Sequence, residues 1–210
     1  MLHSILYWLA TKPGLFLLLR KFRHFCFRSE KKVIVDFFSS LPNGSDVLQI
    51  ACESGFFSTF FEGYNYHGID LDEAKILYAC KHFEGDFRVM DAMALDFGSQ
   101  LFDGILLSGV FHNIDDITSL QVIRETRRVL KPGGMVFILE DYFPEGRPGL
   151  HERIDRYFDP PAVIRTANQY IDLFSPIISL QYQGMIRSGF RKSMVFCSGH
   201  KQQAAAQQAE

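Results

Sequence analysis

One stretch of the chain, residues 46–70, limits the possible folds more than any other. An apolar run ends in small residues just before Gly55, and a second strand-like run ends at Asp70. This order of elements is the βαβ layout that binds nucleotides: a strand, a tight turn, a helix and a second strand that ends in a carboxylate. The tight turn lets the backbone approach a ligand. The interval of 21 residues from Gln49 to Asp70 suits a carboxylate that accepts hydrogen bonds from ribose hydroxyls. The stretch therefore predicts an adenosine-type cofactor.

Length and charge narrow the class of protein. A chain of 210 residues, 47% hydrophobic and 22% charged, suits one globular domain with a sizeable core. Its net charge of −2 and isoelectric point near 6.4 argue against nucleic acid as a partner. The four cysteines are widely separated and match no zinc or redox spacing, so no metal site is expected. Reduced, core-like cysteines favour a cytoplasmic location.

Positive charge is concentrated in the first 32 residues. Seven lysines and arginines stand there against one glutamate, a net charge of +6. The apolar stretch 5–19 is interrupted by Lys12, Pro13 and Gly14, so it is too short to cross a membrane, and it lacks the basic start and cleavage site of a signal peptide. Two interpretations stay open: a helix packed on the domain, and a peripheral contact of residues 1–28 with an anionic membrane or a lipid-like substrate.

Strand and helix patterns alternate beyond residue 30. We expect a basic, aromatic helical segment at residues 1–29, one domain at 30–200 and a disordered tail at 201–210. Strands are expected at 46–51, 66–70, 87–90, 104–108, 135–140, 178–185 and 192–198. Helices are expected at 15–27, 30–41, 56–61, 72–82, 117–130 and 162–174, with a turn at 131–134. The last two strands read as an antiparallel pair.

Five motifs in order carry a resemblance to a known family. They occupy residues 47–55, 68–72, 91–92, 102–114 and 128–134. With these motifs, the chain resembles the class I S-adenosylmethionine-dependent methyltransferases over about residues 30–200. The resemblance implies an α/β fold: a Rossmann-like three-layer sandwich around a mostly parallel seven-stranded sheet that ends in an antiparallel strand pair.

The resemblance also implies where S-adenosyl-L-methionine binds. Asp70 is expected to accept hydrogen bonds from both ribose hydroxyls, Asp91 to accept one from the adenine amino group, and the backbone N–H of Ala92 to donate to a ring nitrogen. Each aspartate could instead cap the turn behind it. The predicted cofactor-binding residues are Gln49, Ala51, Glu53, Gly55, Asp70, Leu71, Asp91, Ala92 and Ser108.

Three of these residues depart from the family pattern. Gln49 stands where the family usually has an acid that helps to hold the ammonium of the methionine moiety, so charge assistance is lost there. Ala51 and Glu53 replace glycines of the tight turn. Ala51 is tolerated if its φ stays negative, whereas Glu53 brings a carboxylate that could face the carboxylate of the cofactor.

Methyl transfer depends mainly on alignment of the acceptor with the methyl group, with a base for an oxygen nucleophile. His112, just after the fourth strand, is the candidate base by resemblance, although a histidine bonded within its loop is an alternative. Asp141, His151, Glu152 and Asp155 lie on or beside an irregular segment that could cover the acceptor. We expect a small-molecule or lipid-like acceptor.

The sequence also bears on functions other than methyl transfer to a small molecule. The Asp159-Pro160-Pro161 sequence lacks the following aromatic residue of nucleic-acid amino-methylating enzymes, which argues against nucleic acid. The altered turn leaves a second hypothesis open, a catalytically degenerate methyltransferase-like binding or regulatory subunit. The oligomeric state is not predicted.

Overall fold

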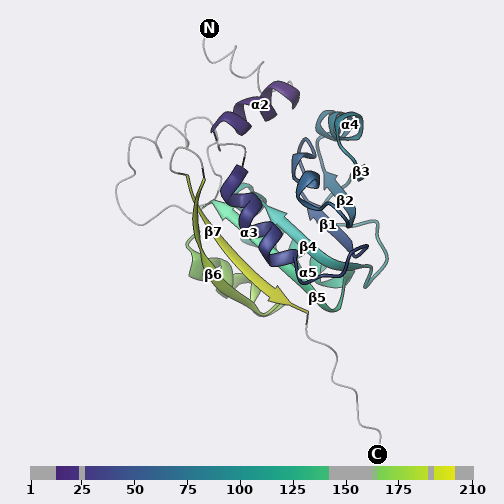
Figure 1. Ribbon diagram of the computed structural model, residues 1–210. Coiled ribbons are helices and arrows are strands. Elements are labelled where there is room, and N and C mark those ends of the chain that lie inside the picture. Colours follow the sequence, from purple (N-terminus) through teal and green to yellow (C-terminus); the bar gives the residue numbers. More distant parts are fainter. Residues whose placement is uncertain (1–12, 24–26, 142–162, 164, 189–191, 202–210) are drawn as a thin grey trace, which may run out of the picture.

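The computed structural model describes residues 13–23, 27–141, 163, 165–188 and 192–201 (Figure 1). The predictions for the segment around His151 and for the tail beyond residue 201 lie outside the described residues, and so does the side chain of Asp141. The helices are α2 (Pro13–Arg23), α3 (Arg28–Phe38), η2 (Phe56–Phe60), α4 (Glu73–His82), η3 (Phe111–Asn113), α5 (Asp116–Val129) and α7 (Ala167–Phe174). The strands are β1 (Asp46–Ile50), β2 (Asn65–Asp70), β3 (Asp86–Val89), β4 (Phe102–Ser108), β5 (Leu130–Asp141), β6 (Leu180–Ser188) and β7 (Lys192–His200).

The strands form one seven-stranded sheet in the order β3-β2-β1-β4-β5-β7-β6. Strand β1 pairs in parallel with β2 and β4, and β3 and β5 extend this parallel part on either side. Strand β7 is antiparallel to both of its neighbours. The chain reverses its winding direction between β1 and β4, and ligands bind beside such a switch point at the carboxyl ends of the strands. The predicted fold class is confirmed.

Two apolar cores cover the two faces of the sheet. Ile34 and Phe38 of α3 pack with η2 and α4 on one face, where α3 crosses the sheet (Figure 1). On the other face, Ile123 of α5 and Phe174 of α7 pack against the strands. The apolar residues of β4 are fully buried, as expected for a parallel strand with helices on both faces.

Polar caps fix where three helices begin. The Asp72 side chain accepts hydrogen bonds from the backbone of α4, and Asp115 accepts one from Thr118 N at 2.8 Å in α5. Thr166 and Gln169 form a capping box at α7. These caps satisfy N–H groups that the first turn leaves without partners. No helix in the described part of the chain is long and apolar enough to cross a membrane.

Several predicted boundaries are shifted. The expected helix 15–27 is α2, which starts at Pro13, where proline is favoured in a first turn. Phe27 instead precedes α3 with a φ of 55°. The turn expected at residues 131–134 is a bulge within β5, because Gly133 N donates to Lys201 O at 2.8 Å and Lys201 N to Gly134 O at 3.0 Å. These bonds join the segment after β7 to the bulge.

Candidate functional site

A cavity of about 270 Å³ opens at the carboxyl ends of β1 to β4. This volume is close to the lower end of the range for small-molecule pockets. We call it the larger cavity. Seven of the nine predicted cofactor-binding residues line it: Ala51, Glu53, Asp70, Leu71, Asp91, Ala92 and Ser108. Residues from four strand ends thus meet in one place, where the sequence predicted the ends of three strands.

Asp70 lies in the wall of the larger cavity and is tied to backbone on both sides. Its Oδ2 accepts a hydrogen bond from Glu53 N at 2.9 Å, and its Oδ1 accepts one from Asp72 N at 3.0 Å. Burial raises the pKa of this carboxyl, while the backbone N–H of Asp72 and the charge of Lys75 oppose that rise. An ionised carboxylate has about four acceptor positions, so each oxygen keeps capacity for a ribose hydroxyl.

Asp91 and Ala92 form the neighbouring wall of the larger cavity. Asp91 Oδ1 accepts a hydrogen bond from Met93 N at 2.8 Å, which fixes the turn after β3. The capping role and the binding role are therefore compatible, because the second carboxylate oxygen is not used in this bond.

The turn after β1 keeps the backbone of a glycine-rich loop although two of its glycines are replaced. Ala51 has a φ of 58° and Glu53 a φ of 51°, and Gly55 has a φ of 80°. The negative φ under which Ala51 would be tolerated without strain is therefore not present. A left-handed conformation costs a residue with a Cβ about 1–2 kcal/mol, so the bond from Glu53 N to Asp70 and the surrounding packing must offset this cost.

Two predicted residues do not line the larger cavity. Gln49 is buried, and its Oε1 accepts a hydrogen bond from the Tyr66 hydroxyl at 2.6 Å. Gly55 lies against α4, where an added Cβ would stand 2.7 Å from that of Ala79 and 2.9 Å from Phe87. Gly55 is thus needed for close packing as well as for its positive φ.

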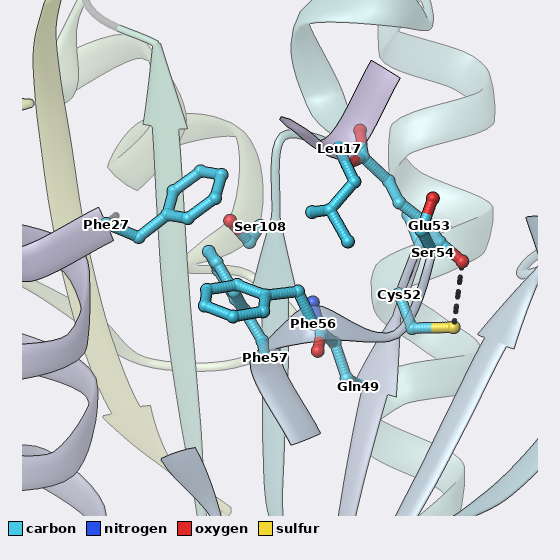
Figure 2. Close-up of a pocket in the computed structure, with 10 residues that line it drawn as sticks. Leu17, Phe27, Gln49, Cys52, Glu53, Ser54, Phe56, Phe57 and Ser108 are labelled. Atoms are coloured by element: carbon cyan, nitrogen blue, oxygen red, sulfur yellow. Dashed lines mark hydrogen bonds between the residues drawn. The ribbon is translucent and has the colours of Figure 1, made fainter. Parts of the chain in front are cut away.

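A second, smaller cavity of about 30 Å³ adjoins the first and shares Ala51, Glu53 and Ser108 with it. Figure 2 shows Phe27, Phe56 and Phe57 on one side of it and Glu53 and Ser54 on the other. Its remaining walls are Leu17 of α2, Gln49 and Cys52. The three phenylalanines pack together, with Phe27 5.4 Å from Phe56 and 5.3 Å from Phe57 between ring centroids.

The residues that line the larger cavity fit an adenosine. Carboxylates face the larger cavity, where hydroxyl and amino groups need acceptors. In the smaller cavity, the buried Oγ of Ser54 has no hydrogen-bond partner among the described residues.

His112 is buried in the loop between β4 and α5 and lines neither cavity. Its Nδ1 lies 2.9 Å from Glu140 Oε2, and its Nε2 lies 3.1 Å from Asn113 Nδ2. A carboxylate only accepts hydrogen bonds, so Nδ1 carries the proton and Nε2 accepts from the Asn113 amide. Asn113 itself lines the larger cavity.

Sequence reasoning missed the two residues that hold this loop. Glu140 is fully buried at the end of β5, and its Oε1 accepts from Val110 N at 2.6 Å and Phe111 N at 2.9 Å. Arg165 donates to Phe111 O at 2.5 Å and Ile114 O at 3.0 Å, and pairs with Asp116 at 2.6 Å. A glutamate at the end of a buried apolar strand was a signal for Glu140, whereas nothing in the local sequence marks Arg165.

Comparison with known proteins agrees with this arrangement. A methyltransferase-domain family model matches residues 48–138. The chain is 28% identical over 149 residues to a 2-phytyl-1,4-naphtoquinone methyltransferase of Thermosynechococcus vestitus, covering 67% of this chain and 64% of that protein. It is 29% identical over 124 residues to a ubiquinone/menaquinone biosynthesis C-methyltransferase of Desulfotalea psychrophila, covering 56% and 49%. The chain thus spans about half to two thirds of the length of these relatives.

Among solved structures, phosphoethanolamine N-methyltransferase 2 of Haemonchus contortus, bound to phosphomonomethylethanolamine and S-adenosylhomocysteine, has a TM-score of 0.69. It is 15% identical, and the match covers 85% of this chain and 54% of that one. The sheet order and the cavity at the strand ends define a Rossmann-like methyltransferase fold. The family-model match over residues 48–138 and the shared fold support a place in the S-adenosylmethionine-dependent methyltransferase family.

Proposed function

We propose that this protein transfers a methyl group from S-adenosyl-L-methionine to an apolar, lipid-like small molecule. The observation that carries the proposal is the larger cavity, where Asp70 and Asp91 lie on adjacent strand ends beside the turn after β1. S-adenosyl-L-methionine, when bound, supplies an electrophilic methyl group on a sulfonium. The residues of the chain then hold the adenosine, exclude water and align the acceptor.

The smaller cavity supports an apolar acceptor. Its walls carry the side chains of Leu17, Phe27, Phe56 and Phe57, and it meets the larger cavity at Ser108. The two curated relatives are named as methyltransferases of quinone biosynthesis, which supports a quinone or a similar isoprenoid-bearing ring as the acceptor.

His112 is proposed to act by position rather than as the base that touches the acceptor. Both of its ring nitrogens are engaged, by Glu140 and Asn113, and it lies behind the wall of the larger cavity. These bonds orient the Asn113 amide at the cavity. The prediction that His112 is itself the base stays untested.

Calorimetric titration with S-adenosylhomocysteine tests cofactor binding. We expect binding by the natural chain, and at least a tenfold loss in an Asp70→Ala variant, because two ribose hydroxyls lose a charged acceptor. Asp36→Ala is the matched control, since Asp36 is an exposed residue of α3 outside both cavities. No binding by the natural chain, or equal binding by the Asp70 variant, would contradict the proposal.

A methyl-transfer assay then tests the acceptor. Labelled S-adenosyl-L-methionine is incubated with naphthoquinones that differ only in whether they carry an isoprenoid chain. We expect label in the product with the chain and little without it, because the apolar walls bind the chain. Equal transfer to both would remove the lipid-like part of the proposal.

A non-catalytic subunit is the second candidate, and one observation favours it. Ala51 and Glu53 occupy left-handed positions that suit glycine. Under this hypothesis, the protein binds S-adenosylhomocysteine and transfers no methyl group to either naphthoquinone. The two assays above therefore separate the candidates.

A further inference from the structure

One face of α2 packs over the smaller cavity. Gly14, Leu17 and Lys21 are three and four positions apart, so they lie on the same side of the helix. A Cβ added at Gly14 would stand 2.8 Å from Tyr78 Cε2, so this end of α2 lies close against α4. Leu17 is 7% exposed and lines the smaller cavity, whereas its neighbour Leu18 is 62% exposed. The side of α2 that carries Lys21 is therefore the side that faces the site.

The ammonium of Lys21 lies beside the smaller cavity, and a second ammonium lies near it. Lys21 Nζ is 4.0 Å from the ring centroid of Phe56, which lines the smaller cavity. From α3, Lys31 Nζ is 5.6 Å from the ring centroid of Phe60. The centroids of the Phe56 and Phe60 rings are themselves 5.6 Å apart. Two ammonium groups from two helices thus contact one pair of aromatic rings at the rim of this cavity.

The charge at this rim is positive on balance. An aromatic ring attracts a cation but carries no net charge that could neutralise it. In the part of the chain that the structure describes, no salt bridge includes Lys21 or Lys31. Arg28 adds an exposed positive charge at the start of α3, while the nearby carboxylates are those of the buried Glu30 and of Glu53 at the cavity. Three basic groups against two carboxylates favour an anionic ligand group at this rim.

We propose that Lys21, with Lys31 beside it, binds a carboxylate or phosphate group of the acceptor. The apolar walls of the smaller cavity contact the apolar part of this molecule, and the ammonium groups at the rim contact its charge. The favoured acceptor is then an anionic amphiphile rather than a neutral one. This assignment rests on the proposed function in one respect, because it takes the smaller cavity as the place of the acceptor.

Two probes with the same chain and different head groups test the assignment. Decanoate carries a carboxylate and decanol a neutral hydroxyl, and both are used below the concentration at which they aggregate. In calorimetric titrations at neutral pH, we expect the natural chain to bind decanoate about fivefold more tightly than decanol, as for one partly exposed ion pair. Lys21→Gln should remove this difference and leave the affinity for decanol unchanged, which also shows that the variant is folded.

Two further variants are the controls. Lys81→Gln removes the same charge from the exposed last turn of α4, outside both cavities, and should keep the preference for decanoate. Lys21→Arg retains a positive charge at the rim and should keep most of that preference. A natural chain that binds decanoate no more tightly than decanol, or a preference that persists in Lys21→Gln, would overturn the inference.

Contact with a bilayer is the other role that these lysines could have. Phosphatidylserine vesicles present anionic head groups in a membrane, whereas decanoate below its aggregation point presents a single molecule. If Lys21→Gln weakens vesicle binding but keeps the preference for decanoate, Lys21 serves a membrane and the inference fails. Intact methyl transfer without a preference for decanoate would contradict this inference alone, whereas loss of cofactor binding or methyl transfer in the natural chain would contradict the proposed function.

Discussion

At the scale of single residues, the turn after β1 keeps one backbone shape with unusual side chains. Ala51 and Glu53 have φ values of 58° and 51°, in the region that glycine enters without steric cost. A turn of this shape lets backbone come close to a ligand. The shape is therefore a property of the fold, whereas the residues that occupy it set its energetic cost.

This cost predicts that Ala51→Gly stabilises the protein. Glycine relieves about 1–2 kcal/mol of strain in the left-handed region. Its larger conformational entropy in the unfolded state offsets about 0.4–1 kcal/mol of this stabilisation. We expect the free energy of unfolding to rise by about 0.5–1 kcal/mol in urea denaturation.

Ala92→Gly is the control for that measurement. Ala92 lines the same cavity and does not have a positive φ. The substitution there should lower the free energy of unfolding by about 0.4–1 kcal/mol. A loss of the same size at Ala51 would contradict the left-handed conformation of the turn.

At this scale, the sequence predicted which residues lie together at the strand ends but not their backbone conformations. The residues at the strand ends were predictable, because parallel strands bring their carboxyl ends to one edge of the sheet. The φ of Ala51 was not, because alanine rarely adopts it and only the neighbouring contacts impose it. The hydrogen bond that Gln49 accepts from Tyr66 was not predictable either, because Tyr66 lies on another strand.

At the scale of elements, the loop between β4 and α5 is held from two sides. Glu140 at the end of β5 binds its first backbone N–H groups, and Arg165, just before α7, binds two of its carbonyls. Both side chains are buried, so water competes little for these bonds. The loop forms one wall of the larger cavity, and a rigid wall holds a ligand in a single position.

Removal of the Glu140 side chain should therefore be costly. Glu140→Ala leaves the donors of Val110 N, Phe111 N and His112 Nδ1 without their acceptor in a buried place. We expect a loss of about 3–4 kcal/mol in the free energy of unfolding, measured by urea denaturation.

Glu125→Ala is the comparison for this loss. Glu125 also accepts a backbone N–H, from Leu95 at 2.9 Å, and pairs with Arg128, but its side chain is partly exposed. Water can replace its bonds, so the expected loss is about 1 kcal/mol. Similar losses for both variants would show that burial of Glu140 is not what makes it important.

Helices and strands could be predicted where the periodicity of the apolar residues agrees with the capping residues. They could be predicted less well where contacts with distant segments determine the local structure. The apolar run of β4 and the acidic cap of α4 predicted those elements with small shifts at their ends. The bulge at residues 131–134 was expected to be a turn, because lysine, proline and glycine favour one. Its pairing with Lys201 comes from about 70 residues away, and no local pattern contains it.

At the scale of the whole molecule, charge is divided unevenly along the chain. The first 32 residues carry a net charge of +6, while the whole chain carries −2. On α3, Arg28 and Lys32 are exposed, and Phe27 just before the helix is buried against Phe56 and Phe57. A basic surface next to the apolar cavity suits a protein whose acceptor resides in a lipid membrane.

Vesicle sedimentation tests this contact. Because Phe27 belongs to the apolar packing, removing residues 1–28 would disturb the domain, so charge removal is the better change. We expect Arg28→Gln with Lys32→Gln to weaken binding to phosphatidylserine vesicles at least fivefold, about 1 kcal/mol for each basic residue near the surface. Lys81→Gln with Arg88→Gln, at exposed positions of α4 and β3, is the matched control and should bind like the natural chain. Equal binding by all three proteins would contradict a role for α3.

The hydrogen bond between Glu53 N and Asp70 has a consequence for how a long ligand is recognised. One atom pair joins the residue expected at the sugar to the residue expected at the amino acid. Binding at the two ends would then be thermodynamically linked, because a hydroxyl that engages Asp70 Oδ2 would alter the bond that positions the backbone of Glu53. A ligand that contacts both ends should bind more tightly than the sum of its separate halves implies, and a fragment that contacts one end should leave the other less ordered.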